Sequence, residues 1–226
     1  MTALQTIAEN LAVARFPLKF YGLELGTRMT VVRLGDGSLW VHSSIPLTGG
    51  LMEQLKAMGR VQYVVAPNKF HHLFAGDMLR AFPEAQLFSC PGLSAKRPDL
   101  PITAEIEPGC TYGFSEEIGF HVLQGMRYLN EVVFFHKASR TLILTDLCFN
   151  MDKDWPLSTR LMCWLNGVNG KFGCPRDVKW FFVRDRGAFR ASLREVADRD
   201  FDRVIMAHGK IVEEEGKRAF REAFGF

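Results

Sequence analysis

The sequence has no apolar run that approaches the roughly 20 residues needed to cross a bilayer as a helix. Its first residues, MTALQTIAENLAVARF, have no basic start and no continuous apolar stretch, so they do not resemble a signal peptide. Neither sign of charge is in large excess, because the net charge is only +3, and the basic residues are scattered along the chain. We therefore expect a cytoplasmic protein with no membrane span and no nucleic-acid partner.

Cysteine is sparse and shows no pairing pattern. There are five cysteines, an odd number, and no two of them have the CxxC spacing. This excludes the usual signatures of a disulfide framework and of a zinc knuckle. We expect the thiols to be free and to pack as small hydrophobic groups in a reducing compartment.

The chain has enough apolar material for one large core. It has 226 residues, of which 47% are hydrophobic and nineteen are Phe. We expect a single domain over residues 1–226. Residues 151–184 differ from the rest, since they combine a short helical pattern with a Gly/Asn-rich loop and little strand pattern. This segment is predicted to be an insertion or a lid.

Hairpin and strand–helix patterns both recur along the chain, which indicates a mixed α/β class. The apolar runs 28–33 and 38–44 flank an Asp-Gly turn and predict a β-hairpin. Thr48 is placed to cap a helix with apolar residues at 3,4 spacing, and Gly59 to end it. A final helix is predicted over 213–224, with three Glu in its first turn.

Polar residues follow three apolar runs at the points where predicted strands end. VQYVVA is followed by a loop containing His71 and His72, TLILT by Asp146, and RVIMA by His208. Ligands in open α/β sheets collect beyond the carboxyl ends of strands, so we expect these side chains to converge. Neighbouring residues near a helix start point about 100° apart, so only one of the two adjacent histidines is expected to face the site.

Two imidazoles and one carboxylate suit one Zn or Fe ion with open coordination positions. Zinc would lower the pKa of a bound water to about 7 and polarise an ester, lactone or thioester carbonyl, whereas iron would indicate redox chemistry. Taken singly, Asp146 could cap a turn and His208 could be a buried structural histidine. Asn68 or Lys69 is a candidate oxyanion donor, and Arg127 and Tyr128 are candidates to contact an anionic substrate.

The order of these pieces resembles the metallo-β-lactamase superfamily, and most closely its uncharacterised DUF4336 branch. The resemblance lies in RMTVVRLGDGSLWVHSSIPL, APNKFHHLF, FPEAQLFSCPGL, LILTDLCFN and FDRVIMAHG. It implies an αββα sandwich of two mixed β-sheets flanked by helices, with the site at one edge between the sheets.

The resemblance also implies a degenerate metal site. The superfamily's HxHxDH motif would place its residues on Asn68, Phe70, His72 and Leu73, and a shift of one residue would use His71 instead. Its next histidine follows a glycine, but here Met126 follows that glycine. Its bridging Asp and final His match Asp146 and His208. The implied site is at most mononuclear, with metal ligands among His71, His72, Asp146 and His208, and with His72 and Asp146 as catalytic residues.

These features leave three functions open. The first is a metal-dependent hydrolase with an unknown small substrate. The second is a metal-free, non-catalytic member of the fold that binds a ligand or partner in a cleft lined by Asn68, Lys69, Phe70, Met126, Arg127 and Tyr128. The third is a mononuclear iron oxidoreductase. The segment Leu161–Leu165 is expected to be a core-facing helix, with a lid or a homodimer contact as alternatives. His42, His121 and His136 are expected to be ordinary strand residues.

Overall fold

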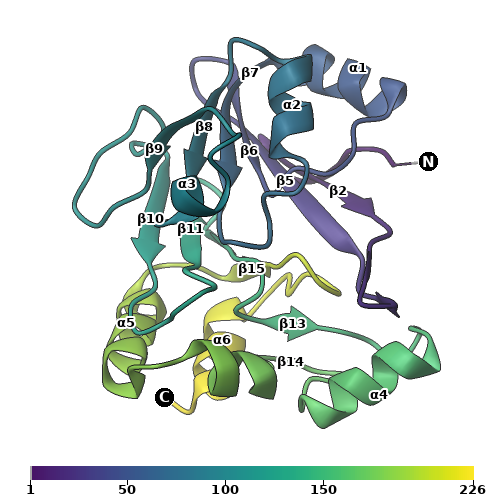
Figure 1. Ribbon diagram of the computed structural model, residues 1–226, viewed down its shortest axis with the longest axis vertical. Helices are drawn as coiled ribbons and strands as arrows, with labels where there is room; N and C mark the ends of the chain where they lie inside the picture. The colour runs from purple at the N-terminus through teal and green to yellow at the C-terminus, as the bar shows by residue number, and fades with distance from the viewer. Residues whose placement is uncertain (1) are drawn as a thin grey trace.

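The computed structural model describes residues 2–226, and its framework is a pair of β-sheets packed face to face (Figure 1). The larger sheet has the strand order β1-β2-β5-β6-β7-β8-β9. Its strands are β1 (Gln5–Ala8), β2 (Leu11–Phe16), β5 (Thr27–Arg33), β6 (Ser38–His42), β7 (Arg60–Ala66), β8 (Gln86–Ser89) and β9 (Ile102–Glu105). Pairing is antiparallel from β1 to β6 and parallel from β6 to β9, so the sheet is mixed.

The smaller sheet has the order β10-β11-β12-β15, and only its β12–β15 pair is parallel. Its strands are β10 (Ile118–Val122), β11 (Val132–His136), β12 (Thr141–Ile143) and β15 (Arg203–Ile205). Two short ribbons complete the strands: β3 (Lys19–Phe20) with β4 (Leu23–Glu24), and β13 (Phe149–Asn150) with β14 (Phe172–Gly173).

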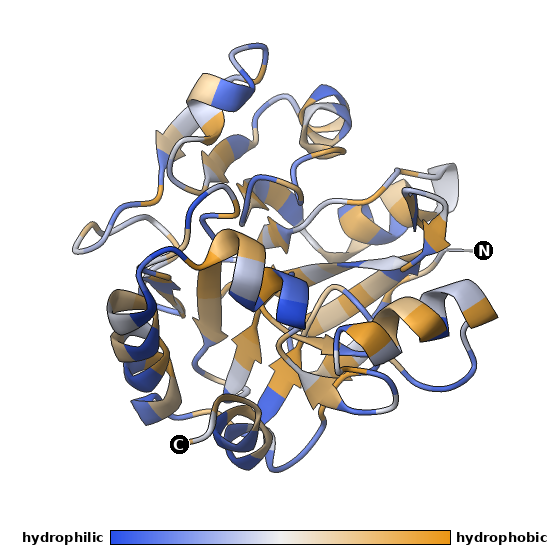
Figure 2. Cartoon of the chain, turned by 60° about the horizontal axis from the view of Figure 1, so that its bottom comes forward, coloured by the Kyte–Doolittle hydropathy of each residue, from blue (hydrophilic) through white to orange (hydrophobic). Residues whose placement is uncertain are grey.

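Alternating side chains on β11 explain why the sheets form layers. Val132 and Phe134 face the larger sheet, where the Phe134 ring lies 5.1 Å from that of Trp40 on β6. Val133 and Phe135 face the opposite side and pack with α5 and α6. This period of two buries both faces of the strand. The strands at the centre of the molecule are accordingly apolar, while the outer helices carry hydrophilic stretches (Figure 2).

Helices cover both outer faces, which completes the predicted αββα sandwich (Figure 1). The helices are α1 (Gly49–Met58), α2 (Ala75–Ala81), α3 (Leu93–Lys96), α4 (Leu157–Leu165), α5 (Arg186–Asp198) and α6 (Gly216–Phe224), with one π-helical turn, η1 (Val178–Phe182). Within residues 2–226 no helix is both long and apolar enough to cross a membrane.

Local signals predicted several elements correctly. The hairpin across the Asp-Gly turn joins β5 to β6, and Asp36 Oδ1 accepts a hydrogen bond from Ser38 N at 2.8 Å. Thr48 caps α1 by accepting from Leu51 N, and Gly59 ends the helix. A Cβ at Gly59 would collide with the Gly37 carbonyl, so this helix end requires glycine.

The predicted start of the last helix was wrong. The helix begins at Gly216, so the three glutamates precede its first turn. Val212 pairs with Val204 as a continuation of the sheet, and Glu213 forms an ion pair with Arg203 at 3.0 Å. The Val212 bridge and the Glu213 ion pair are contacts with a distant strand that the local sequence does not reveal, and Glu215 adopts the left-handed conformation directly before the helix.

The core-facing role expected for Leu161–Leu165 was also wrong for most of that segment. Leu161, Trp164 and Leu165 are each more than half exposed on α4. Only Cys163 is buried, and Met162 faces the cavity described below. The segment 151–184 contains α4, β14 and η1, of which α4 and η1 contribute residues to the lining of that cavity.

Candidate metal centre

Three side chains from the ends of three strands converge on one point. His71 follows β7, Asp146 follows β12, and His208 follows β15. One potential ligand atom from each residue lies within 4.8 Å of the other two. Because β7 belongs to the larger sheet while β12 and β15 belong to the smaller one, the group lies where the two sheets meet.

Both imidazoles direct the same nitrogen towards the carboxylate. His208 Nε2 lies 3.1 Å and His71 Nε2 lies 3.4 Å from Asp146 Oδ1. The opposite nitrogens are held from behind: His208 Nδ1 contacts the Gly26 carbonyl at 2.8 Å, and His71 Nδ1 contacts Ser43 Oγ at 2.7 Å. This is the usual arrangement of metal-binding histidines, whose second nitrogen is hydrogen-bonded and fixes the ring orientation.

The Nδ1 contact of His208 determines which of its nitrogens faces Asp146. A carbonyl oxygen can only accept, so His208 Nδ1 must carry the proton donated to Gly26. In the neutral ring Nε2 then presents a lone pair to Asp146. Burial by itself would raise the pKa of Asp146, but the neighbouring His71 and His208 outweigh it and hold that pKa well below its ordinary value. A neutral ring could offer this Nε2 lone pair to a metal ion, whereas without an ion a proton on Nε2 bridges the ring to the carboxylate.

Asn68 builds the loop that presents His71. Its Oδ1 accepts from the backbone N–H groups of Phe70 and His71, both at 2.8 Å. Its Nδ2 donates to Asp146 Oδ2 at 2.7 Å and to Thr145 Oγ1 at 2.9 Å. Asn68 is fully buried with its amide already engaged, so the expected oxyanion contact is not supported by this arrangement.

Glu131, which the sequence reasoning did not single out, holds the Asp146 loop. Its fully buried carboxylate accepts from Thr145 N at 2.7 Å, Asp146 N at 2.9 Å and Leu147 N at 3.0 Å. Burial and the Asp146 charge raise the pKa of Glu131 to about 7. The available signal was a carboxylate directly before the apolar run VVFFH, where a buried charge needs partners.

Arg28 performs the same task for the His208 loop, and it was also missed. It is buried within the apolar strand β5, and burial lowers its pKa to about 10. Its guanidinium donates to the Met206 carbonyl and, at 2.6 Å, to the Gly209 carbonyl. These carbonyls bracket His208. Gly209 has φ +91°, and a Cβ there would collide with the Asn150 carbonyl.

The two adjacent histidines separate as the helical-angle argument requires, but His71 rather than His72 joins the group. His72 Nδ1 lies 2.9 Å from Arg97 Nη1, away from Asp146. Burial, with Lys96 and Arg97 nearby, lowers the pKa of His72 to about 4. The structure therefore places His72 beside the centre, in contact with Arg97, whereas His71 and His208 contact Asp146. The catalytic role expected for His72 stays a prediction.

A cavity of about 640 Å³ opens over the centre. His71, Asp146 and His208 line it together with His72, Lys69, Lys96, Thr27, Ser44 and Asp177. Its remaining walls are apolar: Leu18, Phe20, Tyr21, Leu23, Leu25, Phe70, Leu73, Phe74, Leu129, Phe149, Met162, Val178 and Phe182. The volume is typical of small-molecule sites.

The other residues expected at the substrate site divide into two groups. Lys69 and Phe70 line the cavity, whereas Met126, Arg127 and Tyr128 do not. Met126 instead pairs with Val183, and Arg127 stacks on the Tyr128 ring at 5.2 Å.

The three histidines expected to be ordinary strand residues also lie outside the cavity lining. His42 is buried within β6 and stacks on Trp40, with ring centroids 5.4 Å apart. His121 and His136 contact Ser192 Oγ and Ser139 Oγ at 2.6 and 2.7 Å.

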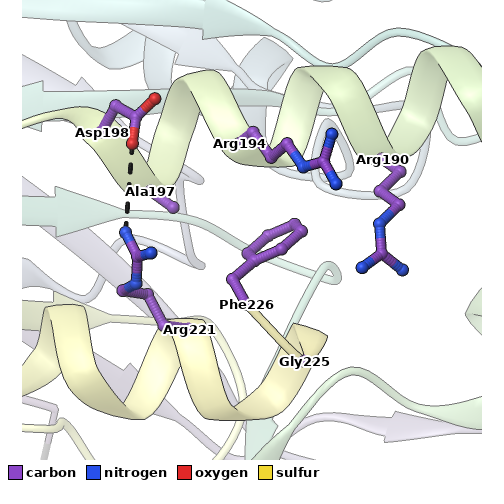
Figure 3. A pocket seen from close by; sticks show the side chains of 7 residues that line it. All are labelled: Arg190, Arg194, Ala197, Asp198, Arg221, Gly225 and Phe226. Atoms are coloured by element: carbon purple, nitrogen blue, oxygen red, sulfur yellow. Dashed lines mark ion pairs between the residues drawn. The ribbon is translucent and has the colours of Figure 1, made fainter.

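A second hollow, of about 380 Å³, lies between α5 and α6 (Figure 3). Arg190 and Arg194 lie over the Phe226 ring at 5.4 and 5.8 Å, and Arg221 faces Asp198 at 3.9 Å. Each guanidinium already has a partner within the chain, so we assign this hollow a packing role.

Comparison with known proteins gives a family and a fold. The sequence model of DUF4336, a domain of unknown function, matches residues 18–166. No curated protein matches the sequence. Solved structures match over nearly the whole chain.

Two of these structures illustrate the likeness. The metallo-β-lactamase FIM-1 from Pseudomonas aeruginosa, in the mono-zinc form, has a TM-score of 0.68 and 10% identity, covering 99% of this chain and 95% of that one. A metallo-β-lactamase from Pontibacter korlensis has a TM-score of 0.67 and 9% identity, covering 100% and 99%. At this identity the likeness establishes the fold.

Proposed function

The chain belongs to the DUF4336 family and has the metallo-β-lactamase fold, and on this premise we propose that it is a metal-dependent hydrolase with a single metal ion. His71, Asp146 and His208 would be the ligands. The observation that carries the proposal is the shared orientation of the two imidazoles. Each has its Nδ1 anchored and its Nε2 directed at the same carboxylate oxygen.

The donor set supports one ion rather than two. In the unshifted register that the resemblance implies, Asn68 and Phe70 fall where the superfamily's first two histidines would be, and Met126 follows the glycine where the next would be. In the register shifted by one residue, which brings in His71, Pro67 and Lys69 fall at the first two positions. None of them offers an imidazole, a carboxylate or a thiolate, which are the side-chain ligands that zinc and iron commonly use in proteins. A bound divalent ion would lower the pKa of water and polarise an acyl carbonyl.

The chain's own residues would prepare the reaction in two ways. Asn68, Glu131 and Arg28 hold the three ligands in place, and that pre-organisation favours catalysis. The apolar walls exclude bulk water from the group that reacts. The proposed reaction adds water across an ester, lactone or thioester bond, yielding a carboxylate and an alcohol or thiol.

Metal content tests the ligand assignment. The protein would be purified without a histidine tag and analysed by mass spectrometry for zinc and iron. We expect close to one ion per chain in the wild type, and its loss in His71→Ala and in His208→Ala. His72→Ala is the matched control, because it removes an adjacent imidazole that contacts Arg97 instead of Asp146. Full metal retention in His208→Ala would overturn the assignment, and the identity of the ion separates a zinc hydrolase from an iron oxidoreductase.

One observation favours a second candidate, a metal-free protein that binds a ligand in the same cavity. Phe70, at a position that a metal ligand would occupy, packs edge-on against Phe20 at 6.3 Å and Phe182 at 5.8 Å. This makes the inner wall apolar. A chelator lowers the melting temperature only if the native protein holds a metal. An unchanged melting temperature with no metal in the purified protein would favour this candidate.

A further inference from the structure

Two lysines that line the cavity form no ion pair in the described part of the chain. Lys69 and Lys96 both line it, and neither forms an ion pair within residues 2–226, whereas Lys19, Lys56 and Lys210 do. Lys96 Nζ donates to the Lys69 carbonyl and lies 5.1 Å from the centre of the Phe70 ring. The nearby acid Asp99 is already paired with Arg97. Lys69 Nζ lies beside Gly92, and the acid that its charge acts on, Glu105, is engaged by the Gly92 and Ser94 N–H groups. Neither ammonium group is therefore neutralised by a direct carboxylate contact from the residues that the structure describes.

The rest of the cavity is suited to an apolar body. Phe20 from the β3–β4 ribbon, Phe70 from the loop after β7 and Phe182 from η1 meet edge-on, so three distant segments form one aromatic wall. A wall of this kind offers no hydrogen bonds and stabilises a ligand by removing apolar surface from water.

A further polar group lies in the cavity lining near the candidate metal ligands. Ser44 Oγ is buried without a hydrogen-bond partner in residues 2–226, and the neighbouring Ser43 holds His71. Buried hydroxyl groups normally have a partner, so Ser44 leaves one unsatisfied polar atom just behind the cavity lining.

We propose that the cavity takes an anionic amphiphile, whose charged head group binds Lys69 and Lys96 and whose apolar body lies along the aromatic wall. This names the substrate class of the hydrolase proposed above and rests on that function for the bond that is cleaved. The cleavable acyl group would lie beside the candidate ligands. Carboxylate and phosphate head groups share the required charge.

Isothermal titration calorimetry with four probes tests this class. Octanoate and octyl phosphate carry both features, 1-octanol lacks the charge, and acetate lacks the apolar body. We expect both amphiphiles to bind at least tenfold more tightly than 1-octanol, and no measurable binding of acetate. Affinity should rise with chain length by up to about fourfold per methylene. The tighter of the two amphiphiles identifies the head group.

Two lysine variants locate the anion. Lys69→Met and Lys96→Met keep an apolar stem and remove the charge. Combined in one protein, they should lower the affinity for octanoate at least tenfold while leaving the affinity for 1-octanol unchanged. Lys217→Met is the matched control, because Lys217 Nζ also donates to a backbone carbonyl, that of Arg199, but does not line the cavity. Melting temperatures confirm that each variant is folded.

The same titrations in His208→Ala separate this proposal from the hydrolase. Octanoate binding that persists there and depends on the lysines would support the amphiphile class even if the wild type held no metal. Binding that disappears in His208→Ala but survives the double lysine variant would mean that the carboxylate binds a metal directly, and it would overturn the proposal. Equal affinity for octanoate and 1-octanol would also overturn it.

Discussion

Replacing Glu131 tests whether one buried carboxylate holds the Asp146 loop. Glu131→Ala would leave three backbone N–H groups without acceptors, at Thr145, Asp146 and Leu147. An orphaned buried donor costs about 1–3 kcal/mol, so the three together cost about 3–9 kcal/mol.

Removing the charge offsets part of this loss. The pKa of Glu131 rises from 4.5 to about 7, mainly through burial. Keeping such a group ionised costs about 3 kcal/mol at higher pH. We therefore expect Glu131→Ala to lower the free energy of unfolding by about 3 kcal/mol, from the middle of the remaining range. Glu131→Gln should stay within about 1 kcal/mol of the wild type, because it leaves about one donor unpaired while also removing the charge.

Urea unfolding followed by circular dichroism, at pH 8 and with a chelator present, measures these differences without a contribution from metal binding. The matched control is Glu105→Ala. Glu105 also accepts from two backbone N–H groups, those of Gly92 and Ser94, but it is partly exposed, so water can replace it. A Glu131→Ala variant no less stable than Glu105→Ala would refute the reasoning.

Two further predictions concern His42 and Gly209. Burial lowers the pKa of His42 from 6.5 to about 3, so the unfolded chain binds a proton that the folded chain excludes. Stability should therefore be highest above pH 6.5 and fall below it, by about 2 kcal/mol at pH 5 from this residue alone; urea unfolding of His42→Leu should lack that part of the fall, and an unchanged slope would contradict the assignment. Gly209→Ala forces a Cβ against the Asn150 carbonyl at φ +91°, so we expect a lower melting temperature and weaker metal retention, and an unaltered protein would show that the His208 loop tolerates displacement.

Short-range patterns in the sequence were enough to predict a mixed α/β class and several elements close together in the chain. Those elements follow from apolar runs and turn residues whose effects act over a few positions, such as the Asp-Gly turn before β6 and the Thr48 cap of α1. The αββα arrangement of the layers was expected from the resemblance to the metallo-β-lactamase superfamily. The same patterns placed polar residues at the ends of β7, β12 and β15, because a strand that leaves a core must end in groups that tolerate a loop. The positions of these polar residues at the strand ends can therefore be predicted from the local sequence.

The composition of the candidate centre depended on contacts between residues far apart in the chain. The choice of His71 over His72 depends on Ser43 and Arg97, each about 25 residues away along the chain. Arg28 reaches Gly209 across 181 positions, and Glu131 holds backbone donors on the next strand's loop. Such partners are set by which strands become neighbours, so no local pattern encodes them.

The sequence alone therefore determined where potential ligands enter the site and that the usual set is incomplete. The tertiary structure decided which of them meet, what holds them, and that two lysines line the same cavity without an ion pair among the described residues. The physical reason is range: turns, caps and periodicity act over one or two turns of chain, whereas burial, ion pairing and ligand geometry arise only when distant segments pack together.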